Sequence, residues 1–296
     1  MRIIRIGTRG STLALLQTNA VREALNGLEA NLMIEVCAIR TTGDILSDAP
    51  LDVIGGKGVF VKEIERRLLK GEIDCAVHSL KDMQAILPDG LVISAFLQRD
   101  DPRDMLFSPA GHSLEDLPAG SRVGTSSMRR RCQVRMRRPD LKVVDIRGNV
   151  PTRIGKIGKT VDAVILAAAG VRRLGLKEGT AMDTETMIPS PGQGIIAVET
   201  RSGNHELNDL FRRIDHGPTR ICAEAEREFL AALGQDCRLP AGAYATWDGR
   251  SISILGMLGS PDETCMGKMR LQGTDPSVGR RLALALKEKV HPEESQ

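Results

Sequence analysis

The sequence predicts an α/β fold, because short apolar strands alternate with helical segments along most of its 296 residues. Two similar junctions support this prediction. In each of them a strand runs through a polar turn into a helix, with Ile6-Gly7-Thr8 in the first and Val123-Gly124-Thr125 in the second. A match this short is equally compatible with chance. The length predicts two domains and leaves room for a small third one.

The first α/β unit opens with a predicted strand over residues 2–7 and a polar turn over residues 8–11. Apolar residues at helical spacing then indicate a helix, namely Leu13, Leu16, Ala20, Val21 and Ala24. The elements that follow are a strand over residues 32–39, a helix over 60–69 and a strand over 73–77. Such alternation implies parallel strands, and ligands collect outside the carboxyl ends of parallel strands. His78 to Asp82 follows the third strand and is therefore expected at this edge.

A second α/β unit begins near residue 100, where Asp100-Asp101-Pro102-Arg103-Asp104 interrupts the apolar pattern like a crossover linker. Its predicted elements are a strand over residues 121–124, a turn over 125–127, a helix over 128–138 and a buried strand over 161–168. After the loop 189–194, a further strand is predicted over residues 195–199. We assign this last strand to the first domain.

The C-terminal part of the chain predicts a small α+β domain. Its expected elements are a helix over residues 219–233, strands over 241–247, 251–258 and 265–271, and a helix over 277–290. Asp248-Gly249 between the first two strands is a hairpin signal. The tail 291–296 is expected to be disordered. The predicted domains are thus residues 1–98 with 195–215, residues 99–194, and residues 216–296.

Composition is typical of a globular protein and excludes several functions. Apolar residues make up 41% and charged residues 27%. No stretch approaches the ~20 apolar residues that cross a membrane, and the N-terminus lacks the apolar centre of a secretory signal, so we expect a cytoplasmic protein. An aromatic content of 2% leaves few stacking platforms for single-stranded nucleic acid. The six scattered cysteines indicate neither a disulfide framework nor a zinc site.

Arginines are concentrated in one segment, although the net charge is only +3. The cluster consists of Arg129, Arg130, Arg131, Arg135, Arg137 and Arg138. This local excess favours a small polyanion as the partner, since a guanidinium can hold a carboxylate through two parallel hydrogen bonds. Part of the run from Arg131 to Arg138 is also typical of a solvated helix face.

Both strand-turn-helix junctions combine hydroxyl groups with the backbone N–H groups of a helix N-terminus, an arrangement that favours anions. Arg9 adds a positive charge to the first junction, and Arg129 and Arg130 add two to the second. The competing interpretation is that the hydroxyl groups only cap helices. The polar residues concerned are Thr8, Ser11 and residues 125–127. The further residues that favour a site for a ligand with several carboxylates are Arg147-Gly148-Asn149, Arg153 and Arg173.

Two further residues could carry chemistry. Asp82 lies just past a buried strand, where a carboxylate beside Lys81 could stay ionised and exchange protons. A structural role in the turn is the competing interpretation. Cys237 lies in a loop between a helix end and a strand, where exposure and Arg238 favour its thiolate, whereas Asp236 opposes it. Gly55-Gly56-Lys57-Gly58 lacks the Walker spacing and predicts a mobile flap instead.

Several motifs, taken in order, resemble the porphobilinogen deaminase family over nearly the whole chain. They are Ile6 to Ser11, Gly55 to Glu63, Ala76 to Asp82, Asp101 to Asp104, Gly124 to Arg130, Arg147 to Val150, Leu166 to Gly170, Pro191 to Gly194, and Cys237 to Tyr244. The resemblance implies two periplasmic-binding-protein-like (type II) α/β domains and a small C-terminal α+β domain. It also implies an active site in the cleft between the first two domains.

The activity that this resemblance implies is the stepwise joining of four porphobilinogen molecules into the linear tetrapyrrole hydroxymethylbilane. Cys237 would carry a dipyrromethane cofactor through a thioether. Each added porphobilinogen would lose ammonia to give an electrophilic methylene-pyrrole cation, which the free α-carbon of the growing chain attacks. Asp82 matches the family's catalytic aspartate, which would offset the developing positive charge and shuttle protons. Water would finally release the product.

The resemblance also implies roles for individual residues, because every pyrrole carries an acetate and a propionate. Cofactor binding is expected from Cys237, Ser11, Lys81, Asp82, Thr125, Ser127, Arg129, Arg130, Arg147 and Gly148. Substrate binding is expected from Arg9, Arg147, Arg153, Arg173 and Gln193, and the flap would include Lys57 and Phe60. We expect a monomeric enzyme of heme biosynthesis that uses no metal and binds neither nucleic acid nor a membrane. Its product would pass to uroporphyrinogen-III synthase.

Three positions depart from the common family pattern, and two other functions compete. Gln84 replaces a frequent proline, the loop from Gly155 to Thr160 is one residue short, and Asp236 lies beside the attachment cysteine. We expect these changes to affect the reaction rate and the flexibility of the protein more than its family identity.

A non-catalytic solute-binding protein is the leading alternative function, but such a protein normally has an export signal and needs no third domain. A nucleic-acid-binding regulator is disfavoured by the low charge and the few aromatic residues.

Overall fold

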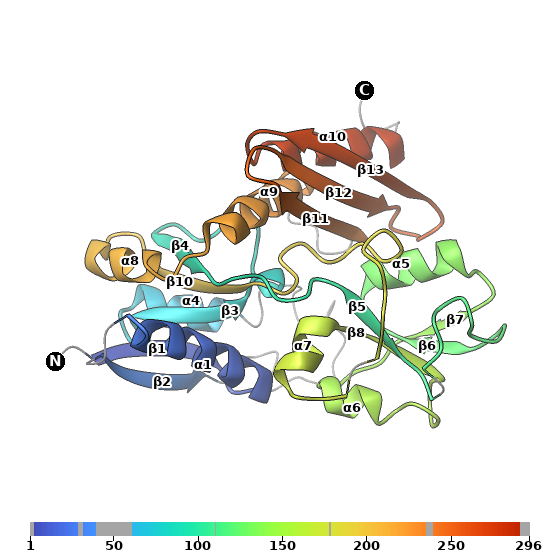
Figure 1. The fold of residues 1–296 in the computed structure, drawn as a ribbon, viewed down its shortest axis with the longest axis horizontal. Helices are drawn as coiled ribbons and strands as arrows, with labels where there is room; N and C mark the ends of the chain where they lie inside the picture. The colour runs from blue at the N-terminus through green and yellow to red at the C-terminus, as the bar shows by residue number, and fades with distance from the viewer. Residues whose placement is uncertain are drawn as a thin grey trace. The chain divides into compact units, whose positions relative to one another are not determined.

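The computed structural model describes residues 3–28, 32–39, 61–109, 111–177, 179–234 and 239–290 (Figure 1). Several predicted features lie outside this described part. They are the flap with Lys57 and Phe60, the predicted attachment residue Cys237 with its neighbour Asp236, and the tail 291–296. The chain divides into two compact units, Met1–Asp100 with Gly194–Arg220, and Asp101–Gln193 with Ile221–Gln296. Within the described ranges no helix is both long and apolar enough to span a membrane.

The first unit is built on a five-stranded sheet. Its order is β2 (Met33–Ile39), β1 (Ile3–Arg9), β3 (Cys75–Ser79), β10 (Ile196–Arg201) and β4 (Leu91–Phe96). Parallel pairing is confirmed for β1 with β2 and with β3. It is wrong for β10, which pairs antiparallel with both β3 and β4. No helical crossover joins β3 to β10, because β10 belongs to a segment that re-enters this sheet after the chain has built the second one.

Helices cover both faces of this sheet. The helices and the short 3₁₀ turn are α1 (Thr12–Asn26), α4 (Lys62–Leu69), η1 (Leu80–Asp82) and α8 (His205–Arg212). Val21 and Leu25 of α1 pack in one core with Ile4 and Ile6 of β1. Ile64 and Leu68 of α4 belong to a separate core that contains Ala76. Successive strand residues point to opposite faces, and Cys75 and Val77 lie in the α1 core, so α1 and α4 cover opposite faces of the sheet.

The second unit contains another five-stranded sheet with the same plan. Its order is β7 (Lys142–Val144), β6 (Arg122–Gly124), β8 (Ala163–Ala167), β5 (Asp104–Phe107) and β9 (Thr180–Ala181). β6 is parallel to β7 and β8, whereas β5 is antiparallel to β8 and β9. The accompanying helices are α5 (Met128–Arg137), α6 (Val150–Ile154) and α7 (Ala168–Arg173). The last residue of the predicted linker, Asp104, is therefore the first residue of a strand, β5.

The two similar junctions occupy equivalent places in the two sheets. Gly7 lies on β1 between β2 and β3, and Gly124 lies on β6 between β7 and β8. A Cβ atom on Gly7 would lie 2.3 Å from Cδ1 of Ile73, and one on Gly124 would lie 2.9 Å from Cδ1 of Ile146. A side chain at either site would therefore force a buried isoleucine to shift. The shared motif reflects equivalent packing and is not an accident of a short match.

Replacing Gly7 by alanine is expected to lower the free energy of unfolding by about 1–3 kcal/mol, because the new methyl group overlaps the Ile73 side chain. Urea unfolding of the purified protein measures this loss. Gly10→Ala is the matched control, since nothing lies within 4 Å of a Cβ atom at that position. Equal unfolding midpoints for the two variants would contradict the packing argument.

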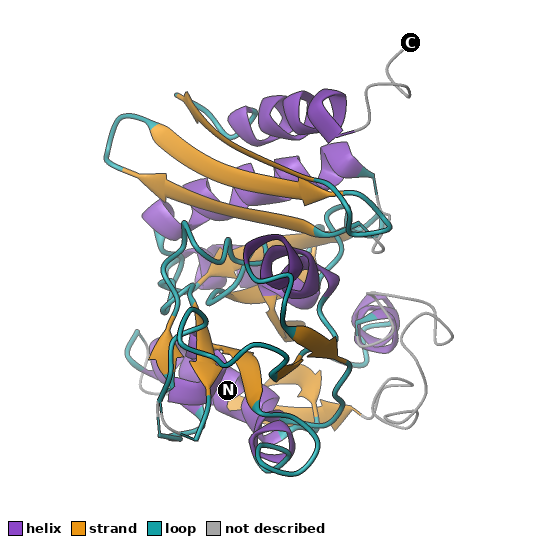
Figure 2. Cartoon of the chain, turned by 90° about the vertical axis from the view of Figure 1, so that its right-hand side faces the viewer, coloured by secondary structure: helices purple, strands orange, loops and turns teal. Residues whose placement is uncertain are grey.

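The C-terminal part forms a small α+β layer, as predicted. β11 (Ala241–Trp247), β12 (Ile252–Gly259) and β13 (Met266–Gly273) form an antiparallel sheet. Figure 2 shows helices along one face of this sheet, and the residues of α9 (Gly217–Leu233) and α10 (Val278–Val290) share its core. The predicted hairpin at Asp248-Gly249 joins β11 to β12, with Gly249 at a φ of 98°. The prediction of two α/β domains followed by a small α+β domain is confirmed.

Candidate functional site

A small cavity of about 60 Å³ lies at the carboxyl ends of β1 and β3 in the first unit. Its lining consists of Arg9, Ser11, Leu13, Ala14, Gln17, Val61, Val77, His78, Ser79 and Asp82. Because the two strands are parallel, the segments that leave them meet at one edge of the sheet. The structure thus brings Asp82 together with Arg9 and Ser11, which lie 73 and 71 residues earlier in the sequence. Lys81 precedes Asp82 in η1 and is half-buried.

Local hydrogen bonds fix the walls of this cavity. Ser11 caps α1, since its Oγ accepts a hydrogen bond of 3.3 Å from the backbone N–H of Ala14. Gln17 of α1 donates through Nε2 to Oγ of Ser79, at 2.7 Å. The 3₁₀ turn is anchored at its start, because the backbone N–H of Leu80 donates to the carbonyl oxygen of Ile195. Asp82 therefore sits on a turn held by buried neighbours, Leu80 and Met83.

The second unit contains a buried cluster of charges centred on Asp104. Nη1 of Arg129 lies 2.8 Å from Oδ2 of Asp104, and Nη2 of Arg130 lies 2.7 Å from Oδ1. Gln193 donates to the same Oδ1 through Nε2, at 2.9 Å. Burial would raise the pKa of Asp104, but the charges of Arg129 and Arg130 outweigh burial and hold that pKa well below its usual value. Asp104 is not among the predicted site residues, because the sequence around it predicts a linker.

Backbone carbonyl groups orient the two arginines further. Arg129 donates through Nη1 to the carbonyl oxygen of Ile188 at 2.6 Å, and Arg130 donates through Nη1 to that of Ile165 at 2.9 Å. Nε of Arg130 is buried and, among the described residues, has no hydrogen-bond partner. Gln193 is 1% exposed, and its amide also donates to the carbonyl oxygen of Pro102. Its described contacts position Asp104, and its substrate role stays a prediction.

The remaining arginines of α5, and Arg138 directly after it, form ion pairs with carboxylates of the same unit. Their partners are Asp145 and Glu263 for Arg131, Glu263 for Arg135, Glu115 for Arg137, and Asp140 for Arg138. The local charge excess that the sequence shows therefore shrinks on folding. Arg129 and Arg130 are buried. Within the run from Arg131 to Arg138, Arg135 and Arg137 are exposed, which confirms the solvated-face interpretation for part of that run.

Arg153 lies close enough to Arg130 and to Arg147 for both charges to act on it. Arg153 of α6 donates through Nε to the carbonyl oxygen of Gly148 at 2.7 Å, and Gly148 has a φ of 110°. Burial and then the charges of Arg130 and Arg147 lower the pKa of Arg153. Among the described residues, no carboxylate forms an ion pair with Arg147 or Arg153. This part of the unit thus carries positive charge that the described carboxylates do not neutralise.

One hydroxyl group before α5 caps the helix, and another holds the preceding turn. Oγ1 of Thr125 accepts a hydrogen bond from the backbone N–H of Ser127 at 3.2 Å, and Oγ of Ser127 accepts one from that of Arg130 at 3.5 Å. Arg173 is the last residue of α7 and is half-buried. Within the described ranges, no group of three or more His, Cys, Asp or Glu side chains could hold a metal ion.

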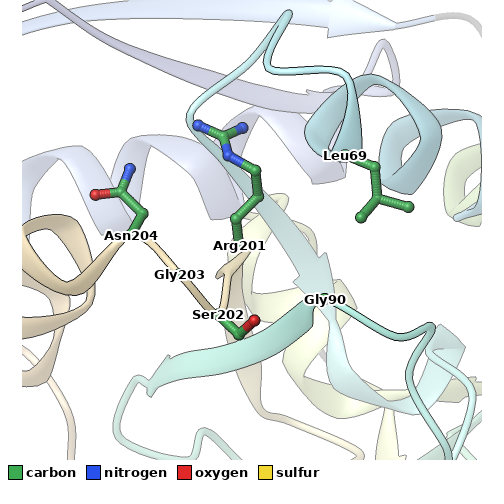
Figure 3. A pocket seen from close by; sticks show the side chains of 6 residues that line it. All are labelled: Leu69, Gly90, Arg201, Ser202, Gly203 and Asn204. Atoms are coloured by element: carbon green, nitrogen blue, oxygen red, sulfur yellow. The ribbon is translucent and has the colours of Figure 1, made fainter.

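A larger hollow of about 500 Å³ lies at the opposite end of the first sheet (Figure 3). It is lined by Leu69, Gly90, Arg201, Ser202, Gly203 and Asn204. Arg201 is the most conspicuous side chain there, and its Nη1 donates to the carbonyl oxygens of Leu68 and Ile73, at 2.6 and 2.9 Å. Because internal carbonyl groups engage this guanidinium and the hollow lies away from Asp82, we assign it no ligand.

Comparison with known proteins gives consistent matches along the chain. Residues 4–209 match the family model described as "Porphobilinogen deaminase, dipyromethane cofactor binding domain". Residues 220–288 match the one described as "Porphobilinogen deaminase, C-terminal domain". Among solved structures, the methionine binding protein MetQ is 15% identical with a TM-score of 0.45 and covers 79% of this chain and 96% of its own. The effector binding domain of BenM with benzoate is 16% identical with a TM-score of 0.44, over 72% of this chain and 90% of its own.

Curated relatives are more similar than these structures. The porphobilinogen deaminase of Syntrophus aciditrophicus is 45% identical over 92% of this chain and 90% of its own length. That of Syntrophomonas wolfei is 45% identical over 97% and 95%, and that of Brevibacillus brevis is 46% identical over 95% and 93%. The family models and these relatives cover both α/β parts and the C-terminal part, and so the chain belongs to the porphobilinogen deaminase family.

Proposed function

We propose that this protein is a hydroxymethylbilane synthase, a transferase that condenses four porphobilinogen molecules onto a dipyrromethane primer attached to Cys237. Ammonia is lost at each addition, and hydrolysis releases the linear tetrapyrrole. The observation that carries this proposal is the group of guanidiniums around Asp104. Arg129 and Arg130 share one carboxylate, and Arg147 and Arg153 lie nearby without a described carboxylate in ion-pair contact. A ligand rich in carboxylates supplies the missing negative charge.

The residues of the second unit fit a dipyrromethane group. Nε of Arg130 is a buried donor that, in the described part of the chain, lacks an acceptor, and an added carboxylate would provide one. A carboxylate would also offset the burial and the repulsion from Arg130 and Arg147 that together lower the pKa of Arg153. When bound, this group supplies the free pyrrole α-carbon that accepts the first substrate unit. Carboxylate binding by Arg129, Arg130, Arg147 and Arg153 is therefore our proposal for these side chains.

Asp82 is proposed as the catalytic residue. Its carboxylate lines the cavity at the end of β3, on a turn whose first residue is hydrogen-bonded to Ile195. A carboxylate in that place can accept hydrogen bonds from pyrrole N–H groups and move a proton within the site. The residues proposed to support it are Arg9 and Ser11 in the cavity wall and Lys81 in the same turn. Thr125, Ser127, Gly148, Arg173, Gln193, Lys57 and Phe60 keep their predicted roles as proposals.

Family membership also argues against the competing function, that of a non-catalytic solute-binding protein. The match extends through residues 220–288, a C-terminal domain that a two-lobed solute-binding protein does not need. The non-catalytic alternative is therefore not favoured. A cytoplasmic monomer that passes its product to uroporphyrinogen-III synthase remains part of the proposal.

Intact-mass measurement tests the proposed attachment. The purified protein is expected to weigh more than its sequence by one dipyrromethane unit, and Cys237→Ser is expected to abolish this excess, because serine offers no thiolate. Cys265→Ser is the matched control, since Cys265 is exposed and free, and this variant should keep the excess. An unmodified mass in a preparation that still forms tetrapyrrole would rule out the proposed attachment.

A further inference from the structure

A histidine and a glutamate form a buried pair beside the Asp82 cavity. His78 lies on β3 and Glu199 on β10, and the antiparallel register places Ala197 opposite His78 and Glu199 opposite Ala76. His78 and Glu199 are therefore diagonal neighbours on one face of the sheet. Nε2 of His78 lies 3.1 Å from Oε2 of Glu199, and the two side chains are 4% and 0% exposed.

A second glutamate completes this cluster from the helix that covers the same face. Glu65 of α4 is 4% exposed. Oε1 of Glu65 and Oε1 of Glu199 are both buried, and neither has a hydrogen-bond partner in the described part of the chain. Two buried carboxyl groups without full hydrogen bonding are costly when both are ionised. The cluster of Glu65, Glu199 and His78 is therefore suited to holding a proton.

The protonation of Glu65 changes near neutral pH. Burial and then the charge of Glu199 raise the pKa of Glu65 to about 7, against the opposing effects of His78 and Lys62. Glu63, on the same helix, behaves in the opposite way. Its ion pair with Arg66 at 2.6 Å, supported by Arg67, lowers its pKa to about 2. The raised pKa of Glu65 therefore comes from its buried surroundings and not from its position on α4.

The cavity connects this cluster to Asp82. His78 and Asp82 both line it, with Arg9 as the basic residue in the lining and Lys62 next to Glu65 on α4. A polar cavity of about 60 Å³ can hold a water molecule, and one water suffices to carry a proton between two groups that do not touch. His78 is therefore the link between the site at Asp82 and the buried glutamates.

We propose that Glu65 and Glu199 form a proton store that, through His78, takes up the proton that Asp82 releases during turnover. The O–H bond of the Asp82 carboxyl breaks and an N–H bond forms on His78, directly or through one water. The proton then passes across the 3.1 Å contact to Glu199 and is held by the carboxyl pair until solvent water accepts it. Asp82 returns to the carboxylate form. Glu65 and Glu199 are positioning residues in this scheme, which rests on the proposed role of Asp82.

The pH dependence of turnover tests the proton store. In the primer-loaded protein, kcat should rise as the pH increases through the range in which Glu65 loses its proton, because only the ionised form can accept another. Glu65→Gln should abolish this rise and lower kcat about tenfold at pH 8. Glu63→Gln, the matched control on the same helix, should keep the wild-type profile. A folded Glu65→Gln variant with the wild-type rise would overturn the proposal.

An infrared titration of the wild-type protein gives a reading that depends neither on turnover nor on the folding of a variant. A band of protonated, buried carboxyl should be present at pH 6 and disappear with a midpoint near pH 7, since burial and then the charge of Glu199 raise the pKa of Glu65 to about 7. Absence of this band at pH 6, or a midpoint far from pH 7, would overturn the proton store. If the band titrates as expected but the wild-type protein forms no tetrapyrrole, the proposed function fails instead. The two failures are thereby distinguishable.

Thermal unfolding also tests whether Glu65 carries a proton in the folded protein. The pKa of Glu65 is higher in the folded protein than in the unfolded chain, so its contribution to stability is fully present below the unfolded pKa and is lost as the pH rises through about 7. The Tm of the wild-type protein should therefore fall relative to that of Glu65→Gln between pH 5 and pH 8. Parallel Tm curves for the two proteins would contradict a proton on Glu65.

Discussion

Replacement of Asp82 by asparagine is expected to lower kcat by about 10²–10⁴-fold while the dipyrromethane mass stays on the protein. Asparagine preserves the size of the side chain, so the η1 turn and its hydrogen bond from Leu80 to Ile195 should persist. What is lost is a carboxylate that can take and return a proton at the cavity wall. Steady-state turnover and intact mass of the same preparation measure the two expectations together.

Asp89→Asn is the matched control for this experiment. Asp89 lies a few residues beyond Asp82 on the chain, is exposed and is absent from the cavity lining. This variant should turn over at the wild-type rate. Near-normal turnover by Asp82→Asn would remove Asp82 from the mechanism, whereas loss of the primer mass in that variant would assign it to primer assembly.

Replacement of Asp104 by alanine is expected to lower the free energy of unfolding by about 3–5 kcal/mol, because it leaves two buried guanidiniums without their carboxylate. Arg129 and Arg130 are each 6% exposed, so water cannot replace the lost partner without local rearrangement. Urea unfolding measures the loss. The retained primer mass should also decrease, since Asp104 orients both arginines that we propose to bind the primer.

Asp162→Ala serves as the control, since Asp162 forms an ion pair of 2.9 Å with Arg122 but both side chains are about 40% exposed. Its unfolding midpoint should change little. A similar small change for Asp104→Ala would show that the buried charge cluster contributes little to stability.

The lowered pKa of Asp104 predicts the pH range of its effect. The folded pKa lies below the unfolded value, so the stability that Asp104 contributes is present above the unfolded pKa and is lost as the pH falls toward the folded pKa. The difference in unfolding free energy between the wild-type protein and Asp104→Ala should therefore be large at neutral pH and shrink below about pH 4. A constant difference across this range would contradict an ionised Asp104.

Short-range patterns in the sequence predicted most strands and long helices to within a few residues. The strand predicted over residues 2–7 is longer in the structure, because Thr8 and Arg9 also pair with β2. β4 and β5 were missed for different reasons. Leu91–Phe96 lies in no clear helix–strand alternation, and Asp104 placed a charge at the start of an apolar run. The short helices α6 and α7 span too few residues for a helical period to be visible.

The sequence by itself determined the alternation of strands and helices, the glycines of the two junctions and the motifs that identify the family, because each depends on residues that are close along the chain. Only the tertiary structure decided which charges are neutralised. Glu263 pairs with Arg135 across 128 residues, and Glu199 meets His78 across 121. The ionisation of a buried group depends on such distant partners and on the loss of water around it, and neither is encoded in a local pattern.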